Sequence, residues 1–206
     1  KSAMGFTVSI YAVPAGTSRT AIKDHILSLW GGPDAPDYIL LVGDTDGDTS
    51  TSATIPHWTG GGSRGAATDL PYSCMGPGDD WYPDIFIGRF SVRTVQQLQA
   101  VVDKSLFVEA GNFPDPNYVK RAALLASSDS TTQSEQLHDW VISTYLEPAG
   151  FTPIRIYANQ GGNTPQITAA VNNGCLFVTY FGHSGSSGWS SPTFGQGDVN
   201  ALANNG

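Results

Sequence analysis

The residues best suited to chemistry lie in the segment GHSGS at positions 182–186, directly after the apolar run Cys175–Phe181. A histidine at the end of a buried strand can act as a general base, and His183 has that position. The glycines allow a substrate backbone to approach, and free loop amides can hold an oxyanion. The expected backbone donors are Gly182, Ser184 and Gly185. The alternative is a histidine that only hydrogen-bonds its own loop.

The same segment is close to the nucleophile elbow G-x-S-x-G of serine hydrolases. Its fifth position is Ser186 instead of glycine. An α/β-hydrolase also needs an acid and a histidine downstream of the serine. Asp198 follows, but no histidine does. Serine hydrolysis is therefore excluded within these 206 residues.

A general base requires an orienting group and a nucleophile. Asp129 ends the segment RAALLASSD at 121–129, and its carboxylate can bind the second imidazole nitrogen of His183. Alternatively, Asp129 caps the turn that follows it. The two thiols are Cys74 and Cys175. Cys175 opens a buried strand, where an inert packed thiol is expected, whereas Cys74 lies in a long loop.

Alternating strand and helix patterns position these residues. Apolar runs predict strands at 5–13, 37–43, 85–90, 121–126, 152–157 and 175–181. Apolar residues at helical spacing predict helices at 17–30, 94–109, 134–146, 164–172 and 198–203. This order predicts an α/β fold, with a mainly parallel sheet covered on both faces and a single domain over 1–206. Ligands bind such folds beyond the carboxyl ends of the strands.

Residues 44–83 show no clear periodicity, and a loop of this length is usually functional or folded into small hairpins. The loop opens with DTDGD at 44–48. Alternating carboxylates suit Ca²⁺, so the predicted structural calcium ligands are Asp44, Asp46 and Asp48. The spacing is not that of an EF-hand, because its twelfth position is Ile55. A solvated acidic loop is the alternative interpretation.

Composition and charge exclude several classes of protein. Ten basic and 18 acidic residues give a formal net charge of −8, which disfavours nucleic-acid binding. No apolar run approaches the roughly 20 residues of a membrane span. No phosphate-binding loop follows the first expected strand, which disfavours a nucleotide-binding domain. Abundant Ser, Thr, Asn and Asp with scarce Lys and Glu favour a secreted or cell-surface protein.

Four segments, with their order and approximate spacing, resemble the gingipain-type cysteine peptidases, peptidase family C25 of the caspase-like clan. They are YILLVGD at 38–44, DIFIGRFS at 84–91, ALLASSD at 123–129, and YFGHSG at 180–185 with Trp189 after it. The resemblance implies a three-layer α/β/α caspase-like fold and a Cys–His endopeptidase that acts on protein or peptide substrates. It places the catalytic histidine at His183 and the third site residue at Asp129.

The resemblance also implies a substrate pocket. In arginine-specific members an acidic residue in the next helix holds the basic P1 side chain, and Glu135 aligns there. Cleavage after Arg or Lys is the corresponding expectation, with Trp189 assigned to substrate binding. The alternative for Glu135 is a helix-start carboxylate favoured by the helix dipole.

In this family the nucleophilic cysteine follows the histidine at the end of the next strand. No cysteine follows His183 here, so the resemblance places the nucleophile beyond residue 206, in the remainder of the same domain. The 206 residues alone are then expected to be inactive.

Family members bind structural calcium, which agrees with the acidic loop. A non-catalytic, calcium-stabilised binding module stays open as the alternative. A Cys shortly beyond residue 206 favours the enzyme, and Ser, Gly or Ala at that position favours the non-catalytic module.

Overall fold

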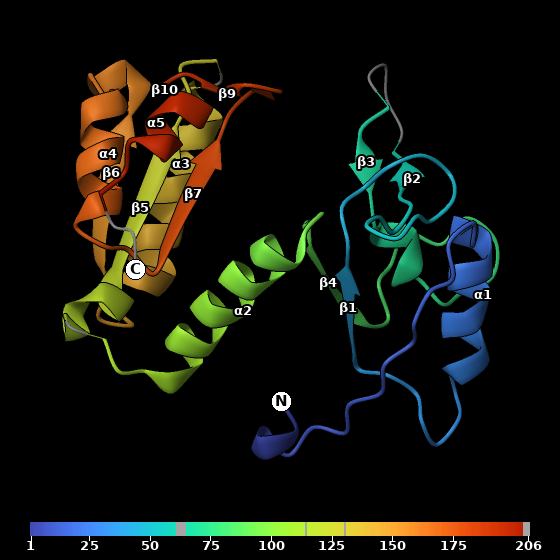
Figure 1. Cartoon of the computed structure of the whole chain (residues 1–206). Coiled ribbons are helices and arrows are strands. Elements are labelled where there is room, and N and C mark those ends of the chain that lie inside the picture. The colour runs from blue at the N-terminus through green and yellow to red at the C-terminus, as the bar shows by residue number, and fades with distance from the viewer. Residues whose placement is uncertain (61–64, 114, 130, 204–206) are drawn as a thin grey trace. The chain divides into compact units, whose positions relative to one another are not determined.

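The computed structural model describes residues 1–60, 65–113, 115–129 and 131–203 (Figure 1). It has the predicted α/β character, with helices and parallel strands alternating along the chain. The chain divides into two compact units, Lys1–Leu106 and Phe107–Gly206. A single domain over 1–206 stays a prediction. None of the helices in the described ranges combines the length and apolar character needed to cross a membrane.

The first unit is built around two parallel strands, β1 (Tyr38–Val42) and β4 (Phe86–Phe90), paired in register from end to end. The long loop between them is folded into small elements, as the sequence predicted. These are the hairpin β2 (Trp58–Thr59) and β3 (Ala67–Thr68) and the 3₁₀ turn η2 (Leu70–Tyr72). The remaining helical elements are η1 (Ser2–Met4), α1 (Arg19–Leu29) and α2 (Val95–Ala110), the last of which contains the boundary between the units.

Helix α1 begins at a side-chain cap and buries one apolar stripe. The Ser18 hydroxyl accepts a hydrogen bond from the Ala21 amide at 3.1 Å, which satisfies one of the free donors of the first turn. Ile22 and Ile26 are buried one turn apart. Their buried partners in this core are Leu41, Tyr72, Met75 and Ile85.

Two expectations for the first unit are wrong. Residues 5–13 form no strand, and no strand in the described part of the chain pairs with them. Alternating apolar residues are insufficient, because a strand also needs a neighbour for its backbone donors and acceptors. The second error concerns 37–43, expected to be buried on both faces. Leu41 is buried, whereas Leu40 and Val42 are exposed.

The second unit contains a three-stranded parallel sheet in the order β6–β5–β7 (Figure 1). Strand β5 (Arg121–Ala126) is central, and it pairs with β6 (Thr152–Tyr157) and β7 (Phe177–Phe181). The first two strands have the predicted bounds, and β7 begins two residues later than predicted. Five consecutive residues of β5, from Ala122 to Ala126, are buried, as expected for a central parallel strand.

Helices cover both faces of this sheet, which gives the second unit three α/β/α layers. Ala123 and Leu125 pack in one cluster with Ile167 and Ala170 of α4 (Thr164–Asn172). The alternate residues Ala122 and Leu124 pack in another cluster, with Ile142 and Leu146. These last two belong to the π-helical turn η4 (Ile142–Leu146), which continues α3 (Thr131–Val141).

Short elements follow β7 and shape the segment after its carboxyl end. Three strands form an antiparallel sheet, namely β8 (Ser184–Gly185), β9 (Gly188–Ser190) and β10 (Thr193–Gly195). Helix α5 (Gln196–Asn200) comes next, two residues earlier than predicted. The 3₁₀ turns η3 (Pro116–Lys120) and η5 (Ala158–Gln160) complete the unit. This arrangement folds the chain back against the histidine that follows β7.

Candidate active site

His183 and Asp129 meet at the carboxyl edge of the β6–β5–β7 sheet. Asp129 follows β5 and His183 follows β7, and the last paired residues of these neighbouring strands are Ala126 and Phe181. The Nδ1 atom of His183 lies 2.7 Å from Oδ2 of Asp129. The contact joins residues 54 positions apart. It forms because parallel neighbours end at the same edge of a sheet.

The His183 ring is open to solvent and held by one carboxylate. The His183 side chain is 85% exposed, and that of Asp129 is 34% exposed. The hydrogen bond to His183 lowers the pKa of Asp129, and a second one to Ser127 adds to the effect. An ionised Asp129 accepts the Nδ1 proton of the ring. The neutral imidazole then presents the lone pair of Nε2 for acid–base work.

Gly182 occupies a position where no side chain fits. A Cβ atom there would lie 2.4 Å from both Cβ of Ser127 and the hydroxyl oxygen of Tyr180. Gly185 differs, since a Cβ there would meet no atom within 4 Å. The first glycine is required by packing of the loop, and the second borders open space. Gly185 and Ser184 form β8.

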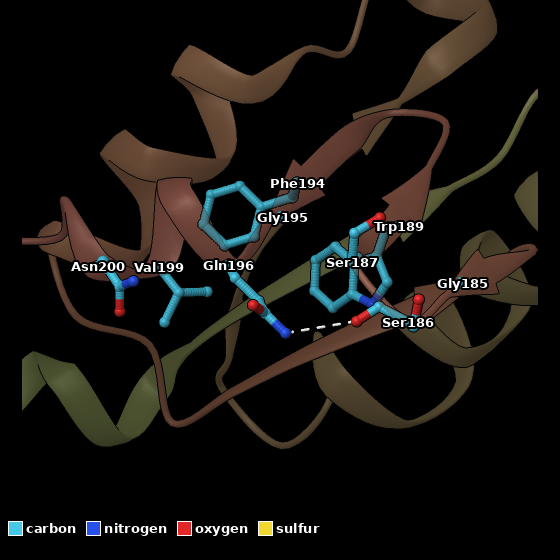
Figure 2. A pocket seen from close by; sticks show the side chains of 10 residues that line it. Gly185, Ser186, Ser187, Trp189, Phe194, Gly195, Gln196, Val199 and Asn200 are labelled. Carbon is cyan, nitrogen blue, oxygen red and sulfur yellow. Dashed lines mark hydrogen bonds between the residues drawn. The ribbon is translucent and has the colours of Figure 1, made fainter.

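Trp189 lies in β9 and connects the loop to a pocket. Its ring stacks on Tyr180 with centroids 4.7 Å apart and an interplanar angle of 14°. Its side chain lines a pocket of about 480 Å³ together with the apolar side chains of Phe194 and Val199. Figure 2 shows these side chains. The Gln196 side-chain amide donates to the Ser186 carbonyl across this pocket at 3.3 Å.

Glu135 lies on α3 with one satisfied and one unsatisfied oxygen. Its Oε2 atom accepts a hydrogen bond from the Gln160 side chain at 2.8 Å. Within the described ranges, its Oε1 atom is buried and has no hydrogen-bond partner. The hydroxyl of neighbouring Ser134 donates to the Ser127 carbonyl at 3.2 Å. Glu135 therefore belongs to a helix tied to the end of β5.

One turn further along α3, His138 is 4% exposed and lies near the rings of Tyr157 and Phe181. Burial lowers the pKa of His138. Its Nδ1 atom has no partner among the described residues. Burial disfavours the charged form of this histidine, which belongs to the core, whereas His183 is exposed.

Both thiols are poor nucleophiles. Cys74, in the first unit, is 4% exposed and its Sγ donates to the Leu70 carbonyl at 3.3 Å. Cys175 precedes β7, and its Sγ donates to the Ala170 carbonyl at 3.3 Å. Burial raises the pKa of each thiol. The reactive species is the thiolate, so these environments disfavour nucleophilic attack.

The acidic loop after β1 does not gather its three carboxylates. Asp44 is paired with Arg93, which lowers the pKa of Asp44. Asp48 is paired with Arg19 at 2.7 Å. Throughout the described ranges, no group of three His, Cys, Asp or Glu side chains is arranged to hold a metal ion. Calcium binding by Asp44, Asp46 and Asp48 stays a prediction without support from this geometry.

Several of the predicted site residues lie together at the strand ends. The structure brings together His183, Asp129 and Gly182, and it places Trp189 beside the same loop. Sequence reasoning missed Tyr180, whose hydroxyl donates to the His183 carbonyl at 2.9 Å. Its position three residues before the histidine offered only a weak signal, because an inward strand tyrosine usually belongs to the core.

The fold and site define an α/β protein with an imidazole–carboxylate pair at its strand ends. The profile described as Peptidase family C25 matches residues 2–206, and the chain belongs to this family. That confirms the resemblance seen in the sequence.

Lys-gingipain of Porphyromonas gingivalis is 26% identical over 99% of this chain. Gingipain R2 of the same organism is 28% identical over 81% of this chain. The solved Arg-specific cysteine proteinase gingipain R (RGPB) has 26% identity and a TM-score of 0.71 over 91% of this chain. The 206 residues span 12% of Lys-gingipain, 22% of gingipain R2 and 42% of the solved chain. They therefore correspond to less than half of each relative.

Proposed function

We propose that this chain supplies the acid–base half of a cysteine endopeptidase of the gingipain type. The observation that carries the proposal is the 2.7 Å contact between His183 Nδ1 and Asp129 Oδ2 at the strand ends. The carboxylate orients the ring and stabilises its protonated form. The exposed edge of the ring is left for the substrate and the nucleophile.

The nucleophile of the proposal is a cysteine outside residues 1–206. Cys74 and Cys175 are unsuited because burial raises their pKa values. Cys175 also precedes β7, whereas His183 follows it. Among the described strands, β7 pairs only with β5, so its other edge can accept a strand from the rest of the protein. A parallel strand there would end beside His183 and deliver its thiol.

The chemistry is thiol acyl transfer. The thiolate attacks the scissile carbonyl carbon and forms a C–S bond, while backbone amides of the 182–185 loop stabilise the oxyanion. Protonated His183 gives its proton to the leaving nitrogen as the C–N bond breaks. Neutral His183 then takes a proton from water, whose oxygen attacks the thioester and releases the acid and the thiol. Asp129 keeps the ring oriented throughout.

The substrate of the proposal is a peptide with a basic P1 side chain. Glu135 has a buried oxygen without a partner in the described part of the chain, and a guanidinium or ammonium group would satisfy it. The solved relative gingipain R is an Arg-specific proteinase, which agrees with this choice. Trp189 offers a flat apolar surface for another part of the peptide. The composition supports action outside the cell or at its surface.

The test is cleavage of a fluorogenic peptide library varied at P1, using the whole protein with and without a thiol alkylator. Alkylator-sensitive cleavage after Arg or Lys, lost in Glu135→Gln but kept in Glu147→Gln, supports the full proposal. Alkylator-sensitive cleavage after other residues supports the acid–base role of His183 and rejects Glu135 as the residue that binds the P1 side chain. Absence of cleavage with Ca²⁺ present contradicts the enzyme and favours the non-catalytic module.

A further inference from the structure

The His183 ring is not held in place by packing. Its side chain is 85% exposed, and within the described ranges Asp129 is its one hydrogen-bond partner. An exposed side chain keeps its rotamer freedom, and the hydrogen bond to Asp129 limits that freedom for His183. The position of Nε2 then depends both on this bond and on the backbone atoms from which the ring projects.

That backbone is clamped at its carbonyl oxygen by three donors. The Tyr180 hydroxyl lies 2.9 Å from the His183 carbonyl oxygen. Ser190 adds its amide at 3.1 Å and its hydroxyl at 2.5 Å. Such a convergence of donors on one exposed-loop carbonyl restrains the residue from which the imidazole projects.

The Tyr180 hydroxyl also lies 3.2 Å from the carbonyl oxygen of Ser191, between β9 and β10, so its single proton is shared between two carbonyl acceptors. The Ser191 hydroxyl is in turn 2.8 Å from that of Ser128, the residue before Asp129. Tyr180 thus contacts the histidine loop and the turn after β9, and that turn contacts the aspartate loop through the Ser191 hydroxyl.

The Tyr180 ring is itself fixed. It stacks on Trp189 and belongs to the cluster that contains Phe194 and Val178. The chain turns so tightly around the hydroxyl that residue 182 must be glycine, since a Cβ would lie 2.4 Å from that oxygen. A rigid donor of this kind loses little entropy on forming its bond.

We infer that Tyr180 is a positioning residue for the proposed proton transfer, acting through the His183 backbone. The inference rests on the proposed function. Asp129 sets the tautomer and tilt of the ring, and Tyr180 sets the point from which the ring projects. Loss of the hydroxyl should lower turnover and leave substrate binding nearly intact.

The experiment compares Tyr180→Phe with Tyr157→Phe in the whole protein. Tyr157 is a buried tyrosine of the same sheet whose hydroxyl donates to Asp139 at 2.9 Å, so the control removes an equivalent group elsewhere. For Tyr180→Phe we expect kcat to fall at least about tenfold with KM within about twofold. A fall in kcat no larger than that of the control overturns the inference.

Two further variants test the contacts to the His183 carbonyl and the proposed function separately. Ser190→Ala removes another donor to the same carbonyl from an exposed residue, and it should lower kcat in the same direction by a smaller factor. If Tyr180→Phe does not fold, an unchanged kcat in Ser190→Ala overturns the inference. His183→Ala tests the proposed function separately. Loss of activity in His183→Ala with normal kcat in Tyr180→Phe rejects the positioning role alone.

Discussion

Asp44 and Asp129 occupy equivalent places in the two units, yet they have different partners. Each follows a parallel strand, β1 or β5, and each carboxylate has a lowered pKa. The partner of Asp44 is the guanidinium of Arg93, and the partner of Asp129 is the imidazole of His183. An arginine stays protonated in proteins, whereas a histidine gains and loses its proton near neutral pH.

The comparison shows that a carboxylate at a strand end does not by itself mark an active site. In the first unit, fixed charges hold the long loop. Arg89 makes two contacts with Asp69, at 2.7 and 2.8 Å, and donates to the Gly43 and Ile55 carbonyls. In the second unit the carboxylate faces the exposed imidazole of His183. The partner of the carboxylate, a guanidinium or an imidazole, is therefore what distinguishes the two strand ends.

The largest expected effect comes from removing the titratable partner. In the whole protein, His183→Ala should lower kcat by about 10³-fold, because a general acid–base group is lost. His25→Ala is the control, since that ring stacks on Tyr11 in the first unit. Steady-state cleavage of a fluorogenic peptide measures kcat for both variants. Activity within tenfold of wild type in His183→Ala would contradict the assignment.

The direct test of the comparison pairs Asp129→Asn with Asp44→Asn. The first should lower kcat by about 10²-fold, because an amide no longer stabilises the protonated ring. The second should leave kcat within about twofold and reduce stability slightly, because an exposed ion pair contributes little. Peptide cleavage and thermal unfolding are measured on both variants. Equal losses of activity would show that the two strand ends do not differ in role.

A smaller effect is expected from the packing around the His183 loop. Gly182→Ala should destabilise the fold by about 1–3 kcal/mol, because its Cβ would collide with Ser127 and Tyr180. Gly185→Ala is the matched control, with no atom within 4 Å of the new Cβ and an expected change within about 0.5 kcal/mol. Urea unfolding measures the difference. Equal stabilities would contradict the close approach at Gly182.

The smallest effect concerns the buried His138, which contrasts with His183 in the same unit. Burial lowers the pKa of His138 in the folded state, so the unfolded state binds its proton more readily. The resulting stability is present above the unfolded pKa of about 6.5 and is lost as the pH falls below it. His138→Leu should make the melting temperature less dependent on pH between about 7 and 5. Measurements at pH 8, where the ring is neutral in both states, provide the control.

Local patterns in the sequence were enough to predict most of the elements. The bounds of β5, β6 and α4 follow from apolar runs and spacing, which are properties of neighbouring residues. The positions of His183 and Asp129 at strand ends follow from the same patterns. The failed strand at 5–13 marks the limit of this information, because alternation does not supply a pairing partner.

Only the tertiary structure decided which groups meet. Asp129 reaches His183 across 54 residues because β5 and β7 are neighbours, and Asp44 reaches Arg93 across 49. Burial of the thiols, the clamp by Tyr180 and the space at Gly182 likewise depend on segments distant in the chain. Sequence determined the residue types and the local elements, since those rest on short-range sterics and spacing. Pairing and burial arise from packing between distant segments, which no local pattern encodes.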